Sequence, residues 1–151
     1  MPTLVPQPTR IRAAGTKPKL IDEYIGRVNT TTSNVSVAHM RSPQGWEEPG
    51  QTPEFEELTI VLKGTVQVRY KGGQMEVKAS QAVISHAGEW IQYSTPGPDG
   101  AQYIAVCLPA RIPRPASSAD GRPGGRCRSS NSASAPAFPR SGSRVGILFV
   151  A

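Results

Sequence analysis

The chain has 151 residues, 37% of them hydrophobic, and a formal net charge of +6 at pH 7. Residues 1–110 hold ten Lys or Arg and ten Asp or Glu, whereas residues 111–151 hold seven Arg and one Asp. The net positive charge therefore lies in the C-terminal segment. For this reason the basicity of the whole chain is no evidence that the folded domain carries a nucleic-acid-binding surface. The presence of only two cysteines argues against a disulfide framework, and the shortness of the apolar runs argues against a membrane helix. We therefore expect a cytoplasmic protein.

Residues 1–18 contain four prolines and show no sustained periodicity. Proline lacks a backbone N–H and interrupts regular strand pairing. We therefore predict an extended N-terminal arm over residues 1–18, which lies along the folded domain or along a partner subunit.

Eight short segments rich in Val, Ile, Tyr and Thr follow the arm. Most alternate apolar with polar residues, the pattern of a β-strand with one buried face. Turn formers separate the segments, among them Gly64 and the run 96–100. Closely spaced strands without a helical period predict one all-β domain over residues 19–110, a sandwich or a barrel. The predicted strands cover 20–26, 34–41, 55–63, 65–71, 74–79, 81–86, 89–95 and 101–108.

The composition changes abruptly at Arg111. Residues 111–143 hold eight Ser and five Pro, with little apolar content before the final VGILFV. Such a segment buries too little surface to offset its ordering entropy, so we expect a disordered, low-complexity tail over 111–151. Two origins stay open: a genuine tail, or a reading-frame shift in a GC-rich gene, which would yield mostly Arg, Pro, Ala, Gly and Ser.

Two segments of the predicted domain match a known pattern. In EFEELTIVLKG, six residues separate Glu57 from Gly64, and in SHAGEWIQYST, His86 stands two residues before a glycine. The stretch 46–109 thereby resembles the cupin superfamily, whose first motif ends in such a glutamate and glycine and whose second has a proline at the place of His86. The resemblance covers about residues 10–110 and implies a jelly-roll-like cupin β-barrel.

The resemblance does not extend to the metal chemistry of the family. Cupins commonly hold iron or manganese with three histidines and a glutamate. Here the histidine positions are Gln51, Pro53 and Ile91, and only Glu57 remains. Amide and carboxylate oxygens hold harder ions, and hold them less tightly than imidazole holds late transition metals. We therefore expect Gln51 and Glu57 to bind, at most, a weakly held divalent metal such as manganese.

Glu57 is the first candidate for a pocket in the barrel. Strand alternation places it on the inward face, where a buried carboxylate needs a partner. We expect it to belong to a polar pocket, as a metal ligand with Gln51 or as a general base. The alternative is a structural acid that is hydrogen-bonded to Gln51 or Tyr93.

The other pocket candidates are His86, Tyr93, Trp46 and His39. The alternative for His86 is a strand-end residue at the barrel mouth, and the alternative for His39 is a satisfied core residue. Tyr93 has the parity of the lost ligand position, so we expect Tyr93 to face inward. The acidic residues of the loop that follows Trp46, Glu48 among them, are expected to be exposed to solvent.

Two classes of function stay open at this point. The first is a cupin that binds a small polar or anionic metabolite in its barrel, with isomerase, lyase or oxygenase chemistry. The second is a non-catalytic ligand-binding or sensor cupin, because a fold does not supply a reaction. A nucleic-acid partner for the arginine-rich tail is a weaker third hypothesis. We also expect a homodimer, formed through an exposed apolar edge and the N-terminal arm.

Overall fold

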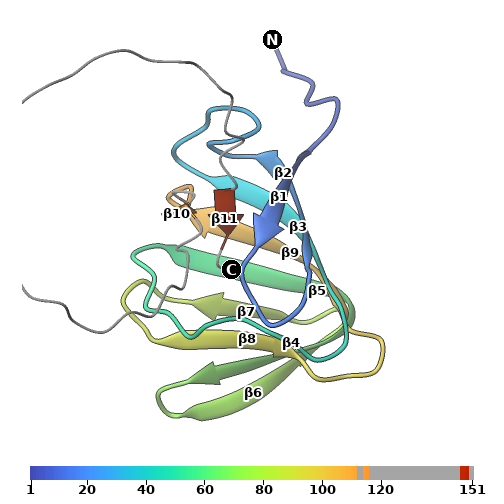
Figure 1. The fold of residues 1–151 in the computed structure, drawn as a ribbon. Coiled ribbons are helices and arrows are strands. Elements are labelled where there is room, and N and C mark those ends of the chain that lie inside the picture. Colours follow the sequence, from blue (N-terminus) through green and yellow to red (C-terminus); the bar gives the residue numbers. More distant parts are fainter. Residues whose placement is uncertain (112–113, 116–146, 150–151) are drawn as a thin grey trace, which may run out of the picture.

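The computed structural model describes residues 1–111, 114–115 and 147–149 of the chain, and these residues form strands and loops without a helix (Figure 1). The predicted all-β class is therefore confirmed, and no helix in these ranges could cross a membrane. The strands are β1 (Thr9–Ala13), β2 (Leu20–Ile25), β3 (Ser36–Ser42), β4 (Trp46–Glu47), β5 (Glu56–Tyr70), β6 (Gly73–Lys78), β7 (Ala82–Ser85), β8 (Ile91–Thr95), β9 (Ala101–Leu108), β10 (Arg114–Pro115) and β11 (Ile147–Phe149).

The strands form one curled sheet (Figure 1). Its order is β10-β11-β1-β2-β3-β9-β5-β8-β4, and β6 and β7 also pair with β5. Every pair is antiparallel except β1 with β11. The first part of β5 pairs with β7 and β9, and its last part pairs with β6 and β8. Strand β5 therefore belongs to both halves of the curled sheet.

Gly64 is the point at which β5 changes from one half of the sheet to the other. The sequence predicted a turn here between strands 55–63 and 65–71, and this prediction is wrong, because β5 runs through Gly64 without interruption. The residue has a φ of 76°, which favours glycine, and a bulge in the pairing with β9 lies just before it. A Cβ atom at Gly64 would lie 2.1 Å from the carbonyl oxygen of Gly100. Glycine thus permits a bend where another residue would clash.

The interior is built by strand alternation on the facing halves of the sheet. On β3 the buried apolar positions are Ala38 and Met40, and on β5 they are Val61, Val66 and Val68. These side chains join one hydrophobic cluster with residues of β1, β2, β4, β6, β8 and β9. Burial of apolar surface contributes about 25 cal/mol per Å² to the free energy of folding. The burial of this cluster is therefore the main interaction that holds the two halves of the sheet together.

Strand β1 lies within the predicted arm and pairs with β2, with Ile11 opposite Ile21. Both side chains are buried. The sequence did not indicate β1 or β4, because prolines surround the first and the second is only two residues long. Most of the predicted tail 111–151 lies outside the described residues.

Replacing Gly64 by alanine tests the role of the bend. The Gly64→Ala change introduces a Cβ atom that collides with backbone, at a φ that alanine rarely adopts, and should lower the free energy of unfolding by about 2 kcal/mol or more. Urea denaturation measures the effect. The matched control is Gly97→Ala, where no atom lies within 4 Å of the added Cβ. Equal stability of the two variants would show that the bend tolerates a side chain.

Candidate functional site

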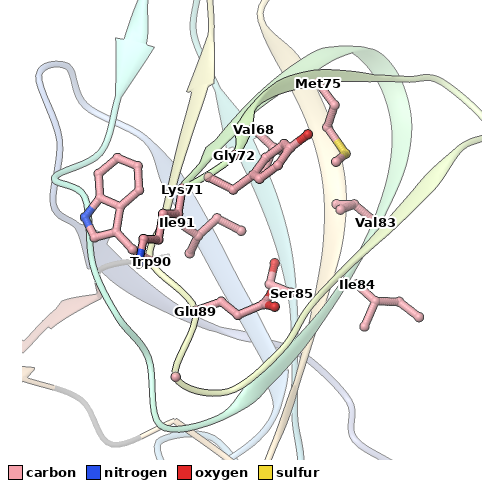
Figure 2. Close-up of a pocket in the computed structure, with 12 residues that line it drawn as sticks. Val68, Lys71, Gly72, Met75, Val83, Ile84, Ser85, Glu89, Trp90 and Ile91 are labelled. Atoms are coloured by element: carbon pink, nitrogen blue, oxygen red, sulfur yellow. The ribbon is translucent and has the colours of Figure 1, made fainter.

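A cavity of about 570 Å³ opens between the β5–β6 hairpin and the loop that joins β7 to β8 (Figure 2). Its size is within the usual range for small-molecule sites. Most of its lining is apolar or aromatic, and the polar side chains in it are Lys71, Ser85 and Glu89. In Figure 2, Trp90 and Ile84 stand at opposite sides of this cavity, with Ile91 and Ser85 between them.

The cavity lies on the inner face of the sheet. Val68 on β5 is directly opposite Met75 on β6 and Tyr93 on β8, and Tyr70 is directly opposite Ile91. Residues opposite each other in a sheet point to the same face, as do residues two apart on one strand. Since Val68 and Tyr93 are buried in the core, the cavity is an open end of the interior.

Large apolar side chains remain accessible at this opening. Tyr70, Met75 and Trp90 are 39%, 41% and 42% exposed, and all three line the cavity. A concave cluster of exposed apolar groups commonly marks a binding site. This cavity is therefore the candidate ligand site, and we refer to it as the barrel pocket.

The floor of the barrel pocket is polar. The hydroxyl groups of Ser85 and Tyr93 lie 2.6 Å apart and share a hydrogen bond, and both side chains are buried. Burial, reinforced by the nearby Glu57 carboxylate, raises the pKa of Tyr93, which therefore remains a neutral phenol at physiological pH. A neutral Tyr–Ser pair can donate or accept a hydrogen bond toward a ligand.

Glu57 lies behind this floor, where it is 2% exposed and opposite Ser85 in the strand register. Its Oε1 accepts a hydrogen bond from the Thr59 hydroxyl at 3.1 Å, and its Oε2 accepts from the Cys107 thiol at 3.9 Å. Burial raises the pKa of Cys107, with a contribution from Glu57, so the thiol is not activated as a thiolate. Thr59 and Cys107 are therefore partners of Glu57 that the sequence analysis did not name.

Charged side chains that the sequence did not indicate are buried around Glu57. Lys19, Glu48 and Arg111 are 4%, 1% and 7% exposed. The expectation that Glu48 is a solvated loop acid is wrong, because β4 pairs with β8 and draws the next residue inside. There the backbone N–H of Tyr93 donates to Glu48 Oε1 at 3.1 Å.

Lys19 reaches into the interior from the residue just before β2. Its Nζ lies 3.9 Å from the centroid of the Trp46 ring and 5.1 Å from that of Tyr103, both within cation–π range. Burial lowers the pKa of Lys19 to about 8, against the opposing effects of Glu48 and Glu57. Burial also raises the pKa of Glu48 well above its ordinary value. Within the described part of the chain, neither Lys19 Nζ nor Glu48 Oε2 has a hydrogen-bond partner.

The other predicted pocket residues lie in different surroundings. Trp46 is buried in the core, and its indole N–H donates to the carbonyl of Ala14 at 3.3 Å. His86 has a side chain that is 62% exposed and pairs with Glu56 at 3.1 Å. His39 is half-buried, on the face of β3 opposite the one that carries the buried apolar residues. None of these three is among the residues that line the barrel pocket.

Two of the four positions that hold a metal in cupins, Gln51 and Ile91, are neighbours in the structure. The backbones of Gln51 and Ile91 pair through two hydrogen bonds of 2.9 and 2.8 Å, and Ile91 lines the barrel pocket. Ile91 and Pro53, however, carry no side-chain ligand atom, and the described residues contain no group of three or more His, Cys, Asp or Glu suited to a metal ion. These donors do not fit a resident iron or zinc ion. Weak manganese binding by Gln51 and Glu57 remains a prediction.

Comparison with known proteins gives a family and a fold. Residues 35–137 match the family described as the AraC-like ligand binding domain. The endoribonuclease YbeY of Myxococcus xanthus is 37% identical over 95 residues, which cover 63% of this chain and 32% of that protein. This chain therefore spans about a third of the length of that relative.

Among solved structures, a predicted oxalate decarboxylase from Thermotoga maritima is 17% identical and has a TM-score of 0.61, covering 72% of this chain and 99% of that one. The cupin domain of Schizosaccharomyces pombe Cnp3 is 11% identical with a TM-score of 0.54, covering 64% of this chain and 69% of that one. At these identities the likeness concerns the fold alone, and it confirms the fold predicted from the two sequence motifs.

Metal content tests the conclusion drawn from the donor set. Protein purified, treated with a chelator and dialysed should hold no stoichiometric iron or zinc, because imidazole ligands are lacking at the cupin positions. Elemental analysis measures this directly. If added manganese binds weakly, Glu57→Gln should remove that binding. Stoichiometric iron or zinc that survives chelation would contradict the conclusion.

The titration of Lys19 can be followed through Trp46. The chain contains two tryptophans, so in a Trp90→Phe variant all tryptophan emission comes from Trp46, which lies beside the Lys19 ammonium. Emission should change with a midpoint near pH 8, as the neighbouring cation is lost. The further change Lys19→Met should abolish the transition. A transition that persists in the double variant would assign it to another group.

The same shift has a defined effect on stability. The pKa of Lys19 is lower in the folded protein than its ordinary value of 10.5, so the unfolded chain binds more protons between pH 8 and 10.5. Stability attributable to this group therefore rises with pH across that window. The free energy of unfolding of the wild type should increase relative to that of Lys19→Met as the pH is raised from 8 to 10.5. The buried tyrosines and Cys107 titrate in both proteins, so their contribution cancels in this difference.

Proposed function

Because this chain belongs to the AraC-like ligand binding domain family and has a cupin fold, we propose that it binds a small molecule in the barrel pocket. The observation that carries the proposal is the cavity of about 570 Å³, which opens on the inner face of the curled sheet. A site of this volume accommodates a metabolite-sized ligand.

The lining narrows the chemistry of the ligand. Tyr70, Met75, Trp90 and Ile91 offer apolar and aromatic contacts, whereas Ser85 offers a hydrogen bond at the floor. The polar or anionic metabolite expected from the sequence should therefore carry an apolar or aromatic body as well as its polar group. The body would pack against the lining, and the polar group would face the floor.

Binding without chemistry is the simpler use of this site. Glu57, the acid retained from the cupin motif, is covered by the floor, and both of its carboxylate oxygens have hydrogen-bond donors. A general base must reach the proton that it removes. We therefore favour the ligand-binding or sensor role, with isomerase, lyase or oxygenase activity as the alternative that turnover of a bound ligand would reveal.

The similarity to an endoribonuclease does not change this proposal. The match covers 32% of that protein, so it does not extend that protein's named activity to this chain. Residues 1–110 of this chain also hold equal numbers of cationic and acidic residues. A surface that binds RNA through phosphates would be expected to concentrate Lys and Arg.

Two finer expectations from the sequence remain proposals. The homodimer is supported by exposed aliphatic side chains on β5 and β9, where Ile60, Leu62 and Leu108 are 45%, 52% and 41% exposed. Such groups on a sheet are typical of protein–protein contacts. A cytoplasmic location is consistent with the buried free thiol of Cys107.

A charge placed in the pocket tests the proposed function. The fluorescent anion 8-anilinonaphthalene-1-sulfonate combines an aromatic body with an acidic group and should bind the wild type saturably. Met75→Glu should weaken this binding by about tenfold or more, equivalent to about 1.4 kcal/mol, because it puts a carboxylate into the apolar lining. Emission of the bound probe measures the affinity.

The control for this experiment is Ile60→Glu. Ile60 is an aliphatic residue of similar exposure, also on a strand, and it does not line the pocket. Its replacement should leave probe binding unchanged. Equal loss of binding in both variants, or no effect in either, would contradict a ligand site in the barrel pocket.

A further inference from the structure

Aliphatic side chains gather on the outer face of the sheet, on the neighbouring strands β5, β7 and β9. On β5 and β9 they alternate with buried residues, so they point away from the interior. Strand register places Ile60 between Ala82 and Ile104. It likewise places Leu58 between Ile84 and Val106. We call this set the outer apolar face, and it consists of Leu58, Ile60, Leu62, Ile84, Ile104 and Val106.

Within the described residues, the outer apolar face is open to solvent. Ile84 is 55% exposed, and Leu62 is 52% exposed. The apolar strand β11 near the C-terminus does not cover the face, because it pairs with β1, and β2, β3 and β9 lie between β1 and β5. A contiguous patch of exposed aliphatic side chains commonly marks a contact with another protein molecule. These observations favour a second molecule as the cover.

The outer apolar face has a charge of opposite sign at each end of β5. Lys63 follows Leu62 and is opposite Gln102 on β9, and it has no ion pair among the described residues. At the other end, Glu56 is opposite Leu108. Its present partner, the imidazole of His86, is largely exposed, so this surface pair adds little to stability and leaves Glu56 free to form another contact. The face therefore runs from a cation to an acid along one strand.

The other ionisable side chains on this side of the sheet lie on β1, β2 and β3, away from β5. They include one acid, Asp22, which accepts from Arg10 at 2.8 Å and also pairs with Arg41. Arg12 and His39 complete the group. Since Asp22 already has two cationic partners, Lys63 and Glu56 are the charges that flank the apolar part of the face.

This pattern is complementary to a second copy of itself. Most homo-oligomers are two-fold symmetric, and packed sheets lie about 10 Å apart with their strands within about 30° of each other. A two-fold axis that crosses β5 near Ile60 brings Lys63 of each copy to Glu56 of the other. An axis along the strands would instead oppose lysine to lysine and acid to acid, which is unfavourable. The charges therefore select the first arrangement.

We propose that two copies of this chain pack their outer apolar faces together about an axis that crosses β5 near Ile60, with Lys63 of each copy beside Glu56 of the other. This inference rests on the homodimer proposed above, to which it adds the contact surface and the relative orientation. The barrel pocket lies on the inner face of the sheet, so this contact leaves it open in both copies.

The contact surface is tested by sedimentation equilibrium of the full chain. The wild type should dimerise, and Ile60→Glu and Leu62→Glu should each raise the dimer dissociation constant about tenfold or more, because each buries a carboxylate in an apolar contact. The matched control is Met75→Glu, since Met75 is an apolar strand residue of similar exposure that lines the barrel pocket instead. It should dimerise like the wild type, and circular dichroism checks that every variant is folded.

The orientation is tested by charge reversal. Lys63→Glu and Glu56→Lys should each raise the dissociation constant about fivefold or more, because each turns two attractive contacts of the dimer into repulsive ones. Combining both changes in one chain should restore the wild-type value, since the contacts become attractive again. The control is Lys71→Glu, which reverses an exposed lysine beyond the end of β5 and should have no effect.

The outcomes separate this inference from the homodimer on which it rests. A wild type that stays monomeric would overturn both. A dimer that neither Ile60→Glu nor Leu62→Glu weakens would leave the homodimer standing and overturn the proposed surface. Single charge reversals without effect, or a double reversal that fails to restore dimerisation, would overturn the proposed orientation.

Discussion

The site depends on the passage of one strand, β5, through both halves of the curled sheet. Its bend at Gly64 is possible because glycine adopts a φ of 76° and leaves room for the carbonyl of Gly100. The part of β5 before the bend carries Glu57 inward, and the part after it carries Val68 inward opposite Tyr93. The bend thereby brings a buried acid and an apolar cavity into a single interior.

An enclosed interior makes strong demands on the polar groups within it. Because no water surrounds them in bulk, each must be paired or must change its protonation state. Tyr93 meets this demand through Ser85, and Glu57 meets it through Thr59 and Cys107. Lys19 and Glu48 meet it only in part. The chain lacks the cupin histidines, yet the interior of the barrel is not purely apolar, because other polar groups occupy it.

The sequence predicted the fold well where the signal was periodic. Alternation located β2, β3 and β6 to β9 and indicated that Tyr93 faces inward. It failed at Gly64, because a glycine between two apolar runs signals a turn as readily as a bend. It missed β1 and β4 because short strands among prolines and glycines carry no period.

The charged interior could not be found in the same way. Lys19 precedes its strand, Glu48 lies in a segment rich in Gly and Pro, and Arg111 opens the basic tail. Judged from its neighbours in the sequence, each of these residues is expected to be a solvent-exposed charge. Only contacts with residues far away in the chain bury it. The Trp46–Thr95 pair of β4 and β8, for example, joins residues far apart in the chain and places Glu48 inside. Single-sequence patterns do not encode such contacts.

The claim that this protein holds a small molecule in its barrel pocket is tested most directly by backbone NMR of ¹⁵N-labelled protein during titration with 8-anilinonaphthalene-1-sulfonate. The account predicts the largest amide shifts at Met75 and Ile91, because both residues line the pocket. Shifts confined to the outer face, around Ile60 and Leu62, would contradict it.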